Sequence, residues 1–178
     1  MASVVGSFIA IKFIELYTKD FIKWDAYKLG LIDENGKKLR DAENSKEAKE
    51  FVSWKNLIRK LKIILNKLPL GQFATKLASF ASAFWLLKED LDTQGLEGYK
   101  VINTIQEFLT KDIDNTMLTE SKLEFGKFTI INEVSPTLVL INEQTKIVGT
   151  VFGINIYEVK DLITSEIYFV SSHDIERL

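Results

Sequence analysis

The spacing of apolar residues changes once along this 178-residue chain, between residues 112 and 118. Before that point, large apolar side chains recur three and four positions apart, which is typical of amphipathic helices. After it, short runs of β-branched residues alternate with turn-forming residues, which favours strands. We therefore expect an α+β fold with a helical domain over residues 1–112 and a β-rich domain over residues 118–178.

The first half is predicted to form a helical bundle of about four helices. The expected ranges are 7–29, 45–68, 72–90 and 99–111. Gly30, Pro69 and Gly71 fit helix ends. Ser45 is expected to cap the second helix, and the Asn-Gly dipeptide at positions 35 and 36 predicts a tight turn or short hairpin.

The second half is predicted to form a small antiparallel β domain of about five short strands. The expected ranges are 127–131, 137–141, 146–151, 154–159 and 167–170. Short connections between these runs favour antiparallel pairing in a sheet or barrel. The Ser-Ser-His-Asp segment at 171–174 contains the chain's one histidine, His173. We expect this segment to cap a final turn, because serine and histidine that are adjacent in sequence rarely converge as a catalytic pair.

The formal net charge of −2 hides a segregation of charge along the chain. Residues 46–76 contain eight basic and two acidic residues, whereas residues 77–178 contain eight basic and sixteen acidic residues. The second predicted helix is therefore basic and amphipathic. Its candidate contact residues for nucleic acid or a protein partner are Lys55, Arg59, Lys60 and Lys62.

Three interpretations of this basic helix are open. The lysines could contact DNA or RNA phosphates, with an affinity that falls steeply with salt. They could instead lie on an anionic membrane surface. The third interpretation is a solvated face opposite the acidic half of the same protein or of a neighbour, and it is favoured because runs of charge usually mark solvated surfaces.

Few catalytic chemistries fit this composition. The chain has no cysteine, and it lacks phosphate-binding glycine loops, a nucleophile elbow and an H-E-x-x-H zinc motif. We therefore predict a protein that is not an enzyme, with no catalytic residue, no cofactor and no metal site. Two carboxylate clusters remain as an enzymatic alternative, because paired carboxylates can run acid–base chemistry or bind Mg²⁺. They comprise Glu89, Asp90 and Asp92, and Asp112 and Asp114.

No segment is expected to cross a membrane. The longest nearly uncharged run, residues 77–87, is about half the length of roughly 20 residues that a spanning helix needs. The N-terminal residues lack the positive charge of a secretory signal, so no signal peptide is expected.

Part of the helical half resembles a family of small virion-associated proteins of tailed bacteriophages. The resemblance lies in the run FIKWDAYKLGLIDENGKKLR at 21–40, followed by a basic helix, the bend LPLG at 68–71, and the Ala/Ser-rich segment ASFASAFWLLKE at 78–89. It covers residues 8–90, about half the chain. It implies a virion or assembly component, located in the virion or the host cytoplasm, and it supplies no catalytic residues.

These observations together predict a non-enzymatic structural or interaction protein. Its expected partners are other copies of itself or other virion proteins, with DNA or RNA as the alternative partner of the basic helix over residues 46–67. The candidate core or subunit-contact residues are Phe51, Trp54, Ile58, Phe84 and Trp85. At helical spacing, such aromatic residues are more often core or interface than a stacking platform for bases.

Overall fold

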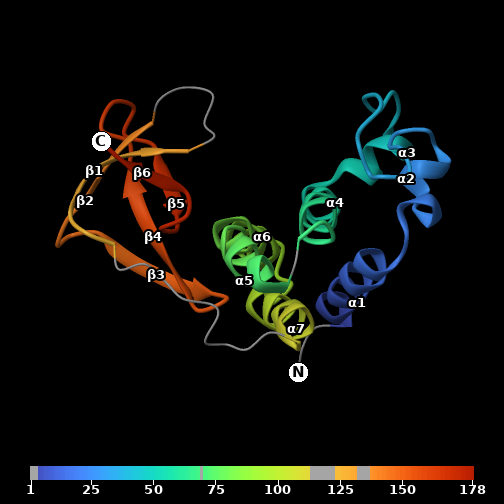
Figure 1. Cartoon of the computed structure of the whole chain (residues 1–178), viewed down its shortest axis with the longest axis horizontal. Coiled ribbons are helices and arrows are strands. Elements are labelled where there is room, and N and C mark those ends of the chain that lie inside the picture. The colour runs from blue at the N-terminus through green and yellow to red at the C-terminus, as the bar shows by residue number, and fades with distance from the viewer. Residues whose placement is uncertain (1–3, 69, 113–122, 132–136) are drawn as a thin grey trace. The chain divides into compact units, whose positions relative to one another are not determined.

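The computed structural model describes residues 4–68, 70–112, 123–131 and 137–178 (Figure 1). Over these residues it contains seven α-helices followed by two three-stranded antiparallel sheets. The α+β class is thus confirmed, but the predicted numbers of about four helices and five strands are too low. The chain forms two compact units. The helical unit comprises Met1–Pro69 and Leu87–Lys111, and the β unit comprises Leu70–Leu86 and Asp112–Leu178.

Three helices build the core of the helical unit. Helix α1 (Val4–Thr18) packs against α4 (Ser53–Leu65) and α7 (Gly98–Thr110). The largest buried side chains between them are aliphatic or aromatic and are fully enclosed, among them Phe13, Ile58, Leu61 and Ile105. Burial of this apolar surface is the main favourable term that holds the three helices together.

The helix predicted over residues 7–29 is broken in the structure. Helix α1 ends at Thr18, and a 3₁₀ turn, η1 (Phe21–Lys23), and a short helix, α2 (Asp25–Lys28), follow. Trp24 has an extended backbone, and its indole N–H donates to the carbonyl oxygen of Lys19 at 3.2 Å. The rings of Phe21 and Trp24 lie 5.1 Å apart and are buried. Apolar spacing could not reveal this break, because the aromatic residues keep a helical spacing across it.

The tight turn predicted at the Asn-Gly dipeptide is confirmed. Ile32 and Lys38 form an antiparallel bridge, and the carboxylate of Asp33 accepts the N–H groups of Asn35 and Lys37 at 2.9 and 2.8 Å. Gly36 has a φ of +80°, and a Cβ there would lie 2.4 Å from the Phe21 ring. Only glycine meets both requirements.

The second and third predicted helices are each divided. Residues 45–65 form α3 (Ser45–Ala48), η2 (Lys49–Phe51) and α4, with an extended Val52 at the break. The cap of α3 is Asn44 and not Ser45, because the Asn44 side chain accepts the N–H of Glu47 at 3.0 Å. The third predicted helix becomes α5 (Leu70–Ala78) and α6 (Ala81–Thr93), whereas α7 matches its predicted range to within one residue.

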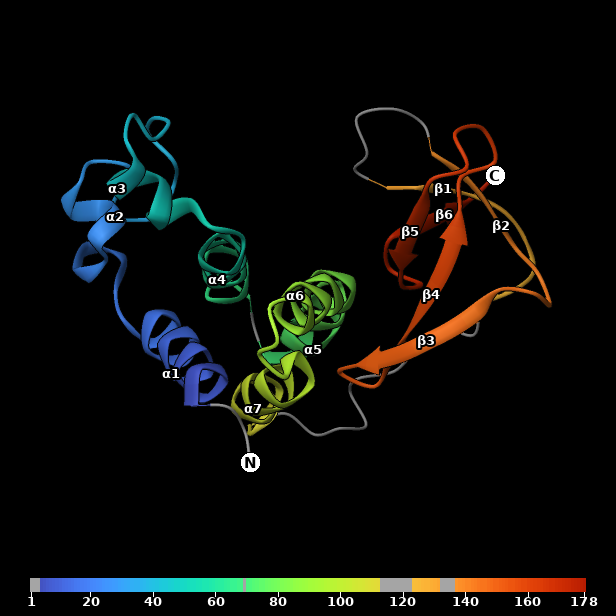
Figure 2. The ribbon, with the colours of Figure 1, turned by 180° about the vertical axis from the view of Figure 1, so that it is seen from behind.

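Six short strands form the sheets of the β unit. Their bounds are β1 Gly126–Ile130, β2 Leu138–Ile141, β3 Lys146–Val151, β4 Ile154–Lys160, β5 Ile167–Val170 and β6 Ile175–Arg177. The orders are β2-β1-β6 and β3-β4-β5, and every pairing is antiparallel (Figure 2). All five predicted strands are present. The prediction that the Ser-Ser-His-Asp segment caps a final turn is wrong, because residues 175–177, which follow it, form a strand that pairs with β1.

Strand β4, the middle strand of the β3-β4-β5 sheet, has buried residues on both faces. One face joins the other sheet in a shared apolar core that includes Val139, Tyr157 and Val159. Because side chains alternate along β4, Ile154 and Ile156 point to the opposite face, and both are fully buried. Helix α6 supplies aromatic residues to the β unit: the ring of Phe84 lies 5.0 Å from that of Phe152, and Trp85 lies 6.4 Å from Phe169.

Candidate functional site

Lys62, one of the four candidate contact residues, is buried in the helical unit. Its side chain leaves the apolar face of α4, and the residue is 7% exposed. The ammonium donates to the carbonyl oxygen of Tyr17 at 2.6 Å and lies 5.8 and 5.6 Å from the ring centres of Tyr17 and Phe21. Burial lowers the pKa of Lys62, and the charge of Asp20 partly offsets that effect. The positive charge of Lys62 therefore caps the C-terminal, carbonyl end of α1.

Two more candidates also have partners within the chain. Lys55 forms an ion pair of 2.9 Å with Glu50 and lies over the ring of Trp54. Arg59 donates to the carbonyl oxygen of Gly36 at 2.9 Å and so holds the Asn-Gly turn against α4. Lys60 differs from both: it is exposed, and no ion pair or hydrogen bond to its side chain is found within the described ranges. The structure therefore does not bring the four basic residues together on one open surface.

The five candidate core or contact residues divide by burial. Ile58 and Phe84 are fully buried, and Trp85 is 8% exposed. Ile58 lies in the helical unit, whereas Phe84 and Trp85 belong to the β unit. Phe51 and Trp54 are half-buried, and the ammonium of Lys38 lies 5.1 Å from the Phe51 ring centre.

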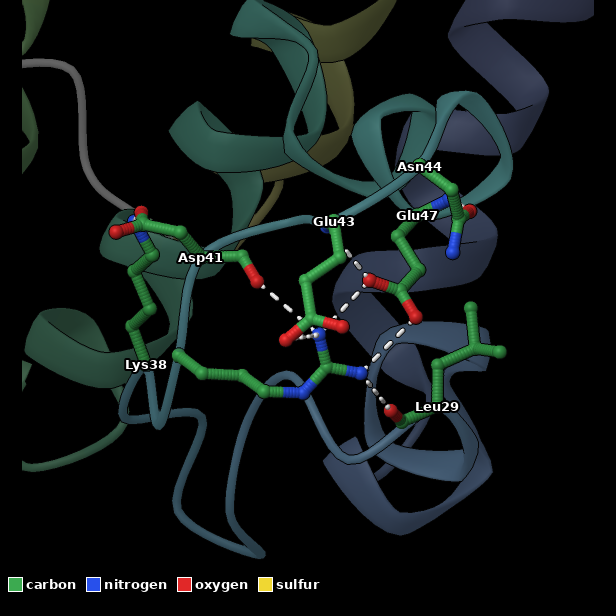
Figure 3. Close-up of polar contacts among 7 residues, drawn as sticks. Leu29, Lys38, Asp41, Glu43, Asn44 and Glu47 are labelled. Carbon is green, nitrogen blue, oxygen red and sulfur yellow. Dashed lines mark hydrogen bonds and ion pairs between the residues drawn. The ribbon is translucent and has the colours of Figure 1, made fainter.

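A cluster of polar contacts surrounds Arg40 (Figure 3). The guanidinium donates to both carboxylate oxygens of Glu47, at 2.8 and 2.9 Å, and to the carbonyl oxygens of Leu29 and Asp41 at 3.0 and 3.1 Å. The Glu47 carboxylate also accepts the N–H of Glu43 at 2.9 Å. Hydrogen bonding to Arg40 is the main cause that lowers the pKa of Glu47 to about 2. This cluster ties the loop after α2 to the first turn of α3.

Sequence reasoning missed the Arg40 cluster. Seven positions separate Glu47 from Arg40. That spacing carries no helical or strand signal, because the two residues lie on opposite sides of a loop. The arrangement has an architectural role, since every donor and acceptor named above is satisfied within the chain.

The acidic clusters do not form a metal site within the described ranges. Glu89 and Asp92 both contact the ammonium of Lys88, at 2.8 and 2.9 Å, and Asp92 also accepts the N–H of Gly98. Asp90 accepts a hydrogen bond from Gln94. Asp114 lies outside the described residues.

The Ser-Ser-His-Asp segment forms a turn between β5 and β6. The carboxylate of Asp174 accepts both the N–H and the hydroxyl of Ser171 at 2.6 Å. His173 donates its backbone N–H to the Ser171 hydroxyl at 3.3 Å. The carboxylate therefore orders the serine and not the imidazole, so the arrangement does not resemble a catalytic triad.

Among the described residues many large apolar side chains are exposed, and two sets of them lie close together along the chain. The first, the α1 face, consists of Phe8 and Ile11, which are 56% and 61% exposed. The second, the β4–β5 tip, consists of Leu162, Ile163 and Ile167, which are 51%, 71% and 61% exposed. Neither group was singled out from the sequence. The signal for the α1 face is its composition: the helix is apolar on most sides, so a surface position must expose some apolar residues.

Comparisons with protein families, with curated proteins and with solved structures gave no match to this chain. The resemblance to virion-associated proteins of tailed bacteriophages therefore stays a prediction.

Among the helices of the described segments, none has both the length and the apolar character that crossing a membrane requires.

Proposed function

We propose that this chain is a non-enzymatic structural or interaction protein, a component of a tailed-phage particle or of its assembly, and that it acts through protein–protein contacts. The observation that carries the proposal is that polar candidate side chains are engaged within the fold, whereas large apolar side chains are exposed. Polar groups that suggested contact with a ligand or partner in the sequence are engaged in holding the fold, as Arg59 and Lys62 illustrate. Large apolar side chains are exposed in both units.

Exposed apolar side chains in groups support a protein partner more than a small molecule or a nucleic acid. A scattered leucine on a surface needs no explanation, but neighbouring large aliphatic residues on an ordered turn are a common feature of interfaces. Such residues contribute binding energy when a partner removes them from water. A nucleic-acid interface would instead expose basic residues and aromatic platforms.

The alternative function, binding to nucleic acid, has narrower support. Lys60 and Lys67 on and just after α4 are exposed, as are Lys46 and Lys49 before it. These lysines could contact phosphates without disturbing the fold. The proposal for this alternative therefore keeps Lys60 and replaces Lys55, Arg59 and Lys62 with the exposed Lys46, Lys49 and Lys67.

The test of the leading proposal is to follow the chain through particle assembly. Particles and their precursors are separated on a density gradient, treated with nuclease, and analysed by quantitative mass spectrometry. We expect the chain to sediment with particles or precursors in a fixed ratio to a major structural protein, and to stay there after nuclease. A soluble phage enzyme from the same lysate is the control for carry-over. Recovery only in the soluble fraction would overturn the proposal, and loss on nuclease treatment would favour nucleic acid.

A further inference from the structure

The Asn-Gly turn of the helical unit presents a free amide side chain to water. Asn35 is exposed, and no hydrogen bond to its side-chain amide is found among the residues that the structure describes. Gly36 follows it and has no side chain that would shield its backbone nitrogen from the Asn35 side chain. The Asn35 amide and the Gly36 nitrogen are the two groups that react in spontaneous deamidation.

Deamidation joins these two neighbours in a ring. The backbone nitrogen of Gly36 attacks the Cγ atom of Asn35, a C–N bond forms, and the bond from Cγ to the amide nitrogen breaks. The amide nitrogen leaves as ammonia and takes the proton that the Gly36 nitrogen gives up. Water then adds to either carbonyl carbon of the succinimide ring and opens it to aspartate or isoaspartate. Water is the co-reactant, and no atom is oxidised or reduced.

The closed turn withholds the nitrogen that this reaction needs. The Gly36 N–H donates to the carbonyl oxygen of Asp33 at 3.0 Å, and that hydrogen bond has to break before the nitrogen can attack Cγ. The Asp33 carboxylate fixes the same turn by accepting the N–H groups of Asn35 and Lys37. Ring closure therefore requires a local opening of the turn.

Two contacts from outside the turn keep it closed. Arg59 on α4 donates to the Gly36 carbonyl oxygen at 2.9 Å, across 23 positions of sequence. Gly36 is also buried against the ring of Phe21. The turn cannot open at Gly36 unless both contacts are lost. The chemical fate of Asn35 is therefore linked to the packing of α4 against this loop.

We propose that Asn35 is a deamidation site that the folded turn keeps unreacted, and that Arg59 controls its reactivity. While the hydrogen bond from Arg59 to Gly36 is present, the amide persists. When the turn opens, ammonia is lost and the change is irreversible. Isoaspartate adds a methylene to the main chain at position 35, which shifts Gly36 relative to Phe21. A loss of structure in this loop is thus recorded as a covalent change, whatever the partner of the protein.

The test follows deamidation of the full chain over time at mildly alkaline pH. Trypsin releases Asn35 in the peptide 29–37, and it releases Asn66, an exposed asparagine followed by lysine, in the peptide 63–67. Mass spectrometry quantifies the mass gain of amide-to-acid conversion, and chromatography separates aspartate from isoaspartate. In guanidinium chloride we expect Asn35 to react far faster than in the folded protein, and faster than Asn66.

Arg59→Met tests the control by α4. The substitution removes the donor to the Gly36 carbonyl oxygen and keeps the aliphatic stem, so the open turn should become roughly tenfold more populated. Because reaction from a transiently open state follows the population of that state, Asn35 should react faster by the same factor. Lys60→Met is the matched control, since that side chain is exposed at the next position of α4, and it should keep the wild-type rate.

A second control separates opening of the turn from unfolding of the whole unit. Ile105→Val shortens a fully buried side chain on α7 and lowers stability, but it leaves the hydrogen bonds of the turn in place. We expect Asn35 to react more slowly in this variant than in Arg59→Met. If circular dichroism shows that Arg59→Met does not fold, Asp33→Ala replaces it. Loss of that carboxylate frees the N–H groups of Asn35 and Lys37, and the same rise is expected.

Three results would overturn the proposal. Equal rates at Asn35 in the folded and the denatured wild type would show that the turn gives no protection. A wild-type rate in Arg59→Met would show that α4 does not control the site. An equal rise in Ile105→Val and Arg59→Met would assign the reaction to unfolding of the whole unit.

Discussion

The ammonium of Lys62 and the carbonyl oxygen of Tyr17 lie 2.6 Å apart, and this hydrogen bond joins the middle of α4 to the C-terminal turn of α1. The last carbonyl groups of a helix have no partner within it, and a cation beside them also interacts favourably with the helix dipole. A lysine that appears in the sequence as part of a basic surface thus acts as an internal helix cap.

Replacing this cap should destabilise the helical unit. In Lys62→Met the aliphatic stem is kept, but the Tyr17 carbonyl loses its donor and the aromatic rings lose the cation. We expect a loss of about 1–3 kcal/mol in the free energy of unfolding. Lys60→Met is the matched control, because that side chain is exposed two positions away and should change stability by less than about 0.5 kcal/mol. Urea unfolding followed by circular dichroism measures both, and equal effects would contradict the capping role.

Acid should weaken the loop that Arg40 and Glu47 hold. The pKa of Glu47 is about 2 in the folded protein and 4.5 without its partners. Between pH 4.5 and 2, the unfolded chain therefore binds more protons than the folded chain, and stability falls as the pH is lowered. In Glu47→Gln this contribution is absent at every pH. We expect a lower melting temperature near neutral pH and a shallower fall below pH 4.5, and parallel pH profiles for the two proteins would contradict this account.

The contact between Gly149 and Trp85 leaves no room for a side chain on β3. A Cβ at position 149 would lie 2.3 Å from the Trp85 ring, so Gly149→Ala should cost about 1–3 kcal/mol through overpacking. Gly126→Ala is the matched control on β1, where the nearest atoms are 3.7 Å away.

The readout is amide hydrogen exchange in β4, which separates an effect on the β unit from one on the helical unit. We expect faster exchange in the Gly149 variant alone. If the clash is the cause, adding Trp85→Phe should recover part of the loss, since coupled neighbours are not additive. A full additive loss would point to a backbone effect instead.

Charge reversal on the exposed lysines tests the nucleic-acid alternative. In Lys60→Glu with Lys67→Glu, the fold should be unchanged, because both side chains are exposed. If the alternative holds, binding to single- or double-stranded DNA should weaken for every sequence, and the slope of log affinity against log salt should become shallower by about two. Fluorescence anisotropy at low salt measures this. Absence of wild-type binding at low salt removes the alternative.

The strands were predictable because each is a local run with its own turn signals. The exception is β6. It is short, and its partner β1 lies about 45 positions earlier, so no local pattern predicts it. Helix breaks were not predictable for a related reason. Val52 and Trp24 adopt extended backbones inside segments that keep helical spacing, because packing with distant residues decides the conformation there.

The candidate surfaces were harder to predict than the fold. Charge counting correctly shows that residues 46–76 are basic, but it does not show which lysines reach inward. Lys60 and Lys62 are two positions apart, so they point to different sides of α4, and only the three-dimensional partners of Lys62 distinguish them. The exposure of Ile163 depends on the hydrogen bonds of Asp161, which no spacing rule contains.

Helix α6 begins in the β unit, with residues up to Leu86, and ends in the helical unit, from Leu87 onward. A truncated protein that starts after residue 112 would keep all six strands and yet lose Phe84 and Trp85. The face of the sheet that carries Ile154 and Ile156 would then be exposed to solvent. We expect such a fragment to aggregate. The chain therefore cannot be divided near residue 112 without removing part of the β unit. A C-terminal fragment that keeps the whole β unit has to begin near residue 70.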